Sequence, residues 1–377
     1  MKSAKILKCL FIILTVLSAI SFAGQTGNED KPLRGKWDFQ MKKAWEIEKA
    51  GKDIIGSVQN FAAAKDGRVY ILDPQNYKIF IMGKDGTFIS AFGKRGEGPG
   101  EIRNFRNGRQ LFAVNNDIIY CDRGRLHYFT LDGKYKKSLI YPAQLKPRTF
   151  VSETTFVSAP VSMASAGNRE GEIKLYSVTD KSEKILFKFK PFDKATASRE
   201  GGSGRISVGI IIEDITPLML VKYRNGKVYF GKNDSYLLNI VDVEGKKTGS
   251  FTIKDRMRKD VSRAYKNNLK KQLGDVPPDM VDKIIDSLPE KASFFQQIVV
   301  DKNGLVYLAV SDPDNTSLRA IDIFSPQGKY LYSSQFKADE GFDIQVVYFR
   351  DDTLLMAMDD EDGNFKVVKY QLKLPTL

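Results

Sequence analysis

Histidine and cysteine are the scarcest reactive residues in this sequence of 377 residues, which has one histidine and two cysteines. A single histidine cannot supply a histidine-rich zinc or iron site. Two cysteines can build neither a four-cysteine cluster nor a disulfide-dense scaffold. With 42% hydrophobic and 28% charged residues, the composition is that of a folded globular protein. Carboxylate and amide side chains are therefore the groups left to form a metal or catalytic site.

Long apolar runs are also missing, apart from Leu10–Ile20 near the N-terminus. Three lysines precede this run and Ser21-Phe22-Ala23 follows it, which is the pattern of a signal peptide. The run is too short for a comfortable transmembrane helix, which needs about twenty residues. We predict that residues 1–23 are a signal peptide cleaved near Ala23 and that the protein is exported, to the periplasm or beyond the cell. An uncleaved N-terminal anchor is the alternative.

The net charge of the chain is +13, and loss of residues 1–23 would remove three lysines and no acids, leaving +10. Cleavage would also remove Cys9 and leave Cys121 without a partner in the chain. We expect Cys121 to be a buried free thiol, the usual state of an isolated cysteine in a core. The mature protein would then be stabilised without cross-links.

A repeated unit is the most informative feature of the sequence. From Phe61 the chain reads FAAAKDGRVYILDPQNYKIFIMGKDGTFISAFG, in which short apolar runs flank Asp66-Gly67 and Asp85-Gly86. Asp-Gly between such runs is a strong hairpin signal, because a type I′ turn needs positive φ at both central residues. The unit therefore predicts four short strands in an antiparallel meander.

The unit returns five times, and the last copy is one strand short. The further copies span residues 111–140, 149–190, 219–253, 297–336 and 344–373. A strand candidate within Trp37–Glu48 precedes the first unit and can supply the missing outer strand, which closes a ring and removes free sheet edges. We predict one all-β domain over residues 24–377, a six-bladed β-propeller. A sandwich pair or an open solenoid does not account for the incomplete last unit.

Two segments interrupt the repeats. Residues 255–291 carry apolar side chains at helical spacing, and Pro277-Pro278 precedes the second helical stretch. They predict a helical insertion between blades four and five. Residues 192–209 are rich in glycine and small polar residues and predict a loop between blades three and four.

The first unit and the linker after it resemble an NHL-type propeller repeat. The matching residues are Asp73, Asn76, Ile79, Asp85, Gly86, Phe92, Gly93, Gly96, Gly98, Pro99, Gly100 and Glu101. The sequence departs from that repeat at Lys78, where arginine is usual, and at Met82 and Ile102, where phenylalanine is usual. As a whole the chain is similar to exported bacterial six-bladed propellers of the NHL or TolB-like type. The resemblance implies the fold and leaves the activity open.

The glycine-rich linker 93–109 is the first candidate site. It carries Lys94, Arg95, Arg103, Arg106 and Arg109. Successive glycines can expose backbone N–H groups, which together with arginine side chains can hold an anion. The alternative is a crossover between blades whose glycines only permit its turns.

The helical insertion is the second candidate. Lys259, Arg263, Lys270 and Lys271 belong to a basic stretch that could contact an anionic surface or an acidic partner. A solvated helix face is the alternative. Residues 339–362, in contrast, hold nine acids and one base, Arg350, so we expect an uneven charge distribution.

Catalytic constellations are harder to find. His127 is predicted to be a packed or surface residue of a strand. The acidic run Asp359–Asp362 before Gly363 is predicted to be a hairpin turn, since Met358 occupies the first position of an EF-type calcium loop. Some six-bladed propellers are calcium-dependent lactonases with ligands from separate blades, and Glu153, Asn233 and Asp301 are candidates for such ligands.

We therefore expect an exported, monomeric binding or scaffold propeller without a catalytic centre and without a metal or other cofactor. Its partner would be a protein, a glycan or another anionic component of the cell envelope, recognised through the channel mouth and the loops between blades. Nucleic acid is not an expected partner, because an exported protein rarely meets it. A calcium-dependent hydrolase with its site in the central channel is the alternative.

Overall fold

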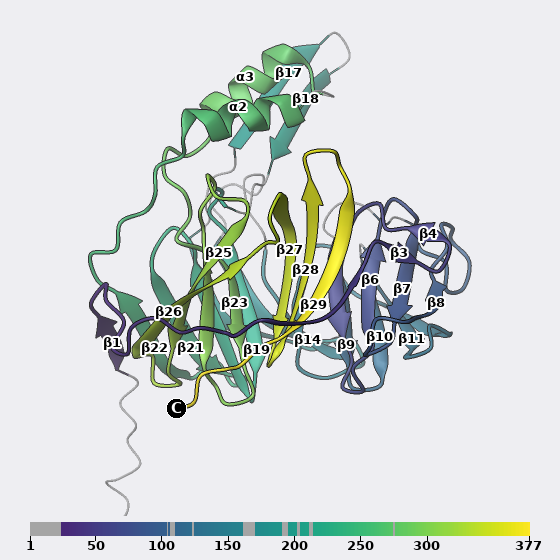
Figure 1. Cartoon of the computed structure of the whole chain (residues 1–377), viewed down its shortest axis with the longest axis horizontal. Coiled ribbons are helices and arrows are strands. Elements are labelled where there is room, and N and C mark those ends of the chain that lie inside the picture. Colours follow the sequence, from purple (N-terminus) through teal and green to yellow (C-terminus); the bar gives the residue numbers. More distant parts are fainter. Residues whose placement is uncertain are drawn as a thin grey trace, which may run out of the picture.

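Six antiparallel sheets arranged around an axis make up most of the molecule (Figure 1). The computed structural model describes residues 24–377 apart from residues 104, 106–109, 123, 161–169, 191–194, 202–203, 211–213 and 274–275. The sheets follow one another along the chain, and each begins with its innermost strand.

The first three blades are meanders of four strands each. Blade one contains β5 (Asn60–Ala63), β6 (Val69–Asp73), β7 (Lys78–Met82) and β8 (Phe88–Phe92). Blade two contains β9 (Gln110–Val114), β10 (Asp117–Asp122), β11 (Arg125–Thr130) and β12 (Tyr135–Ile140). Blade three contains β13 (Pro147–Phe150), β14 (Thr155–Ser158), β15 (Gly171–Ser177) and β16 (Glu183–Phe189).

Among the last three blades, blades four and six each gain a strand from the N-terminal segment. Blade four contains β19 (Met219–Arg224), β20 (Lys227–Lys232), β21 (Leu237–Asp242) and β22 (Lys247–Ile253), with β1 (Gln25–Asn28) added in parallel at its outer edge. Blade five contains β23 (Phe295–Val300), β24 (Val306–Val310), β25 (Leu318–Phe324) and β26 (Tyr330–Lys337). Blade six contains β27 (Phe342–Arg350), β28 (Thr353–Asp360) and β29 (Phe365–Gln371) from the end of the chain.

The ring is closed by β2 (Lys42–Ile47), which pairs antiparallel with β29 as the outer strand of blade six. The inner strand of each blade contacts that of the next, and β27 of blade six contacts β5 of blade one. The prediction that the segment Trp37–Glu48 completes the last unit is confirmed. The protein is a six-bladed β-propeller, with its inner strands around a central channel. A small hairpin of β3 (Lys49–Ala50) and β4 (Asp53–Ile54) links β2 to blade one.

Hydrophobic clusters between neighbouring blades form the core. In the described part of the chain, each pair of adjacent blades shares one such cluster, including the pair formed by blades six and one. The cluster between blades six and one contains Trp45 of β2, Phe80 of β7 and Leu355 of β28. Burial of apolar area stabilises by about 25 cal/mol per Å². Ring closure thus also completes the last part of the core.

The N-terminal segment runs along the outer edges of blades four, five and six (Figure 1). After β1, Lys36 forms a parallel bridge with Ser333 of blade five, and β2 then reaches blade six. The side-chain amide of Asn28 donates to the carbonyls of Thr252 and Gly328, at 3.0 and 2.9 Å. The pairing of β1 with blade four is an addition to the predicted architecture.

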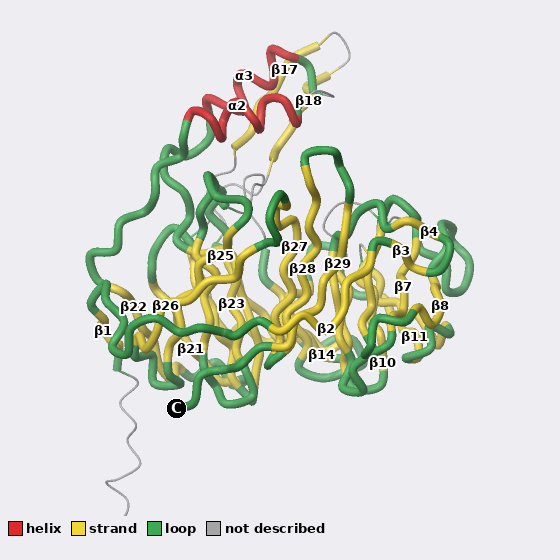
Figure 2. Tube along the Cα trace, in the orientation of Figure 1, coloured by secondary structure: helices red, strands yellow, loops and turns green. Residues whose placement is uncertain are grey.

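An accessory module projects from the ring on the side of the N-terminal ends of the inner strands (Figures 1 and 2). It consists of α2 (Arg263–Gln272) and α3 (Pro278–Asp286), which lie between β22 and β23, and of β17 (Ala195–Gly201) and β18 (Gly204–Ile210). The Ser262 hydroxyl caps α2 by accepting from the Tyr265 N–H at 3.0 Å. Met280 and Ile284 are the buried residues of α3 that pack together.

The prediction of a loop over residues 192–209 is wrong. The described residues of this segment form the antiparallel hairpin β17–β18, which lies against α3 (Figure 1). Its glycines and small residues carry little strand propensity, and strand formation depends strongly on what a strand packs against. That partner helix comes about seventy residues later in the chain, so a local sequence pattern carries no information about it.

No helix among the described residues is long and apolar enough to cross a membrane. The predicted signal peptide, residues 1–23, lies outside the described residues.

Candidate functional site

The basic side chains of the glycine-rich linker are engaged with neighbours. Lys94 Nζ lies 3.4 Å from Glu101 Oε1, and Arg103 Nη2 lies 2.6 Å from Glu97 Oε1. The guanidinium of Arg95 stacks over the ring of Tyr77, at 5.5 Å from its centroid. Arg106 and Arg109 lie outside the described residues. The structure therefore does not gather Lys94, Arg95 and Arg103 around one shared space.

The glycines of this linker enclose the carboxylate of Glu101. The Gly98 N–H donates to Glu101 Oε2 at 3.0 Å, and a Cβ at Gly96 would lie 1.9 Å from the same oxygen. This backbone hydrogen bond, together with Lys94, holds the pKa of Glu101 below its usual value. The loop thus binds the Glu101 carboxylate, an anion of the same chain.

The basic residues near α2 are divided between paired and free ones. Lys259 pairs with Asp312, and Lys270 Nζ lies 2.5 Å from Asp282 Oδ1. Arg263 and Lys271 are exposed and have no carboxylate partner among the described side chains. Only these last two remain available to a partner.

The candidate channel ligands do not converge. Glu153 and Asp301 follow the inner strands β13 and β23, whereas Asn233 follows β20 and therefore lies at the opposite end of the ring. Asp301 Oδ1 accepts from the N–H groups of Asn303 and Leu305, both at 2.9 Å, so it stabilises a turn. In the described ranges, no three His, Cys, Asp or Glu side chains are grouped so as to hold a metal ion.

His127 lies on a strand, as predicted, and its side chain is packed in the core. It is 3% exposed on β11, and its Nδ1 lies 3.0 Å from Ser138 Oγ. Burial lowers its pKa below the usual 6.5. The run Asp359–Asp362 ends β28 and turns into β29, with Gly363 at φ +80°, as predicted for a hairpin.

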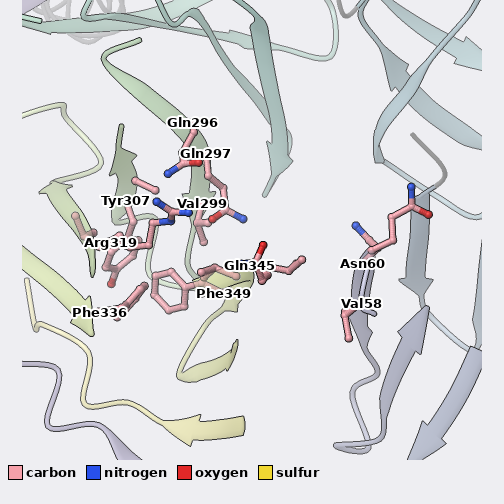
Figure 3. A pocket seen from close by; sticks show the side chains of 15 residues that line it. Val58, Asn60, Gln296, Gln297, Val299, Tyr307, Arg319, Phe336, Gln345 and Phe349 are labelled. Atoms are coloured by element: carbon pink, nitrogen blue, oxygen red, sulfur yellow. The ribbon is translucent and has the colours of Figure 1, made fainter. Parts of the chain in front are cut away.

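A cavity of about 480 Å³ opens from the channel (Figure 3). Its lining includes Asn60 of blade one, Gln297 of blade five and Gln345 of blade six. Because blades one and five are not neighbours, a cavity that touches both must include part of the channel. This volume is in the range of small-molecule sites, about 300–1,000 Å³.

Amide side chains dominate the polar part of this cavity. They are Gln59, Asn60, Gln296, Gln297 and Gln345. Apolar side chains, among them Val299, Ile321 and Phe336, form the remainder. Amide groups donate and accept hydrogen bonds without a charge, which suits hydroxyl, carbonyl and carboxylate groups of a ligand.

Arg319, at the start of β25, is the charged residue of the cavity and lies beside Gln296 and Gln297 (Figure 3). Its Nη2 donates to the Ile344 carbonyl at 3.5 Å, and no described carboxylate lies within ion-pair distance of it. Asp214 lies near enough that Arg319 lowers its pKa, but burial of Asp214 has the larger effect and raises it. Asp214 Oδ1 and Gln296 Nε2 are buried without a hydrogen-bond partner among the described residues.

This cavity was not predicted from the sequence. Its residues come from blades one, five and six, and no motif joins them. The one local signal is Gln296-Gln297, two amides at the start of an inner strand that otherwise reads as apolar.

Comparisons with known proteins address the fold. A family model described as a 6-bladed beta-propeller, DUF5128, matches residues 52–201. No curated protein matches the chain. The structure is similar to that of a DUF4221 family member from Bacteroides vulgatus, with 10% identity, a TM-score of 0.56, and coverage of 89% of this chain and 98% of that one. A virginiamycin B lyase from Staphylococcus aureus has 12% identity and a TM-score of 0.44 over 89% of this chain and all of that chain, 100%. The description of the matching family model agrees with the six sheets of the ring, so the fold is that of a six-bladed β-propeller.

Proposed function

We propose that the protein is an exported, non-catalytic binding propeller that holds a carboxylate-bearing glycan or protein ligand at Arg319. The observation that carries the proposal is an arginine in an amide-lined channel cavity with no described carboxylate in contact with it. An arginine guanidinium forms two parallel hydrogen bonds to a carboxylate, which fixes the orientation of the ligand. The surrounding glutamines would bind neighbouring hydroxyl groups.

Binding fits this cavity better than turnover. Its described lining contains no Asp, Glu, His, Cys, Ser or Lys. The hydroxyl of Tyr307 donates to Asp301 Oδ2 at 3.0 Å, and burial raises the pKa of Tyr307. No pair of a nucleophile and a base therefore faces the bound ligand, as general acid–base or covalent catalysis would need.

The cell envelope is the proposed location. The sequence pattern of residues 1–23 and the resemblance to exported NHL-type propellers support it, as do Arg263 and Lys271, which are free to contact an anionic surface. A calcium-dependent hydrolase stays the alternative. Calcium takes six to eight oxygen ligands, usually with carboxylates among them, and the described lining of the cavity offers amide oxygens.

Calorimetric titration with oligogalacturonate, a carboxylate-bearing glycan, and with its methyl ester tests the proposal. We expect the acid form to bind and the ester to bind about tenfold more weakly or worse, because charge-assisted hydrogen bonds are lost. Arg319→Gln should weaken binding of the acid form to the level of the ester. Arg125→Gln, at an exposed arginine of β11, is the matched control and should bind as the unchanged protein does. Equal binding of both glycans, or turnover that depends on calcium, would refute the proposal.

A further inference from the structure

The opposite end of the channel, where the inner strands end, carries a second group of charged residues. Arg224 ends β19 in blade four, and Arg350 ends β27 in blade six. Arg224 Nη2 lies 2.8 Å from Asp351 Oδ1, and Arg350 Nε lies 3.9 Å from Asp351 Oδ2. Blade five separates these two blades, so the contact between Arg224 and Asp351 spans the end of the channel.

Lys222 adds a third positive charge. It precedes Arg224 by two residues on β19, so the two side chains leave the same face of the strand. Among the described residues it has no hydrogen-bond or ion-pair partner. Its side chain is part-buried, and desolvation of the ammonium group lowers the pKa of Lys222 to about 8. Arg350 and Arg224 lower it as well, while Asp351 opposes them.

The single carboxylate of the group is already occupied. Asp351 Oδ1 accepts both from Arg224 and from the Lys302 N–H, each at 2.8 Å. Arg224 Nε is buried without a partner among the described residues, and Arg350 Nη1 donates to the Ala63 carbonyl at 3.1 Å. The three cations thus exceed the one anion by two charges, and all four side chains are part-buried, where an unpaired charge is less well solvated than at the open surface.

We propose that Lys222, Arg224 and Arg350 form a binding site for a doubly charged oxyanion of the phosphate type, reached from the end of the channel at which the inner strands finish. A dianion matches the excess charge of the group. Its oxygens can accept from the Lys222 ammonium and the Arg224 Nε–H, two donors that lack partners in the part of the chain that the structure describes. This site lies at the other end of the inner strands from the Arg319 cavity, and the inference does not depend on the function proposed for that cavity.

Calorimetric titration of the folded chain with sulfate tests the site, because sulfate keeps its charge across the pH range used. We expect binding at pH 7 that weakens about tenfold or more by pH 9.5, since the lysine must be protonated to attract the anion. Inorganic phosphate and glycerol phosphate, titrated in parallel at pH 7, distinguish a free anion from a phosphoryl group of a larger ligand. Either result supports the site.

Lys222→Met is the decisive variant. It removes a part-buried charge that has no partner among the described residues and keeps the length of the side chain, so folding should be retained and the melting temperature unchanged or higher. We expect sulfate affinity to fall about tenfold or more and its pH dependence to disappear. Lys222→Arg should retain affinity without that pH dependence, and Arg125→Gln should behave as the unchanged protein. Sulfate that does not bind at pH 7, or that binds Lys222→Met as tightly, would overturn the inference.

Discussion

Asp322 on β25 holds Arg256 in a largely buried ion pair, with 2.5 Å between Oδ2 and Nη1. The hydroxyls of Tyr236 and Tyr330 donate to the same carboxylate, each at 2.5 Å. Arg256 Nε also donates to Asp30 at 2.6 Å. The N-terminal segment, blades four and five, and the connection to α2 therefore meet at this ion pair.

Replacing Asp322 with asparagine should be strongly destabilising. It leaves the Arg256 charge buried without its main partner, and breaking such a pair costs about 3–5 kcal/mol. Asp132→Asn is the matched control, because Asp132 pairs with Arg68 but is 70% exposed, where an ion pair contributes little. Urea unfolding of both variants measures the difference. Equal midpoints would contradict the role of Asp322.

Gly86 and Gly226 have similar φ angles but different surroundings. Alanine substitutions at these two positions can therefore distinguish the cost of backbone strain from the cost of a steric clash. Gly86 has φ +86° and a Cβ there would lie 2.7 Å from Trp45 Cγ, whereas Gly226 has φ +76° and open space around it. Alanine at position 226 should cost about 1–2 kcal/mol for the left-handed backbone alone. Alanine at position 86 should cost about 1–3 kcal/mol more, because it displaces the tryptophan of the closing strand. Thermal unfolding of both variants checks this. Similar losses of stability would show that the Trp45 side chain can move aside without a cost in free energy.

The only histidine of the sequence should make stability depend on pH in a defined window. Since burial lowers the folded-state pKa of His127 below 6.5, the unfolded chain takes up the proton first as pH falls. The stabilisation is present above pH 6.5 and decreases as pH falls from there toward the folded-state pKa. The unfolding midpoint in urea, measured at pH 7.5 and 5.5, should fall for the unchanged protein. In His127→Gln the midpoint should depend less on pH. If the midpoint of this variant changes with pH as much as that of the unchanged protein, the effect comes from carboxylates.

Asp73, a residue of the NHL-like pattern, should contribute strongly to the stability of the fold. It is fully buried, and its carboxylate accepts from the N–H groups of Gly56, Gln75 and Asn76 at 3.0, 2.8 and 3.0 Å. Asp73→Ala leaves these donors unpaired and should cost about 3 kcal/mol or more. Asp85→Ala removes an exposed turn carboxylate that accepts from the Thr87 N–H and should cost much less, because water can replace this hydrogen bond. Guanidinium unfolding of the two variants ranks them, and the reverse order would disprove this account.

The ring was predictable because its determinants are local and repeated. Asp66-Gly67 and Asp85-Gly86 mark the turns of hairpins formed by β5 to β8, as predicted. The strand missing from the last unit identified β2. The pairing of β1 with β22 was not predictable, since QTGN carries no strand pattern and forms a strand by adding to an existing edge.

The candidate sites were predicted less well for a related reason. The run of basic residues predicted Lys94 and Arg103 as site residues. In the structure, however, they form ion pairs with Glu101 and Glu97. Arg319 is the only basic residue of β25, so no run of charge marks it. Arg224 and Arg350 are separated by more than a hundred residues of sequence. A propeller assembles its channel from one strand of each blade, so proximity there depends on the ring and not on spacing in the sequence.

The course of the N-terminal segment also sets a limit on the order of folding. Its strands pair with partners far along the chain, Gln25 with Ser250 and Lys42 with Gln371. Contacts of such separation form late, because a long loop must close before they contribute stability. During synthesis, blades one to three can form while the ring stays open, and closure must wait until the last strand has been made. The final kinetic step of folding is therefore expected to be the docking of the first part of the chain to the last.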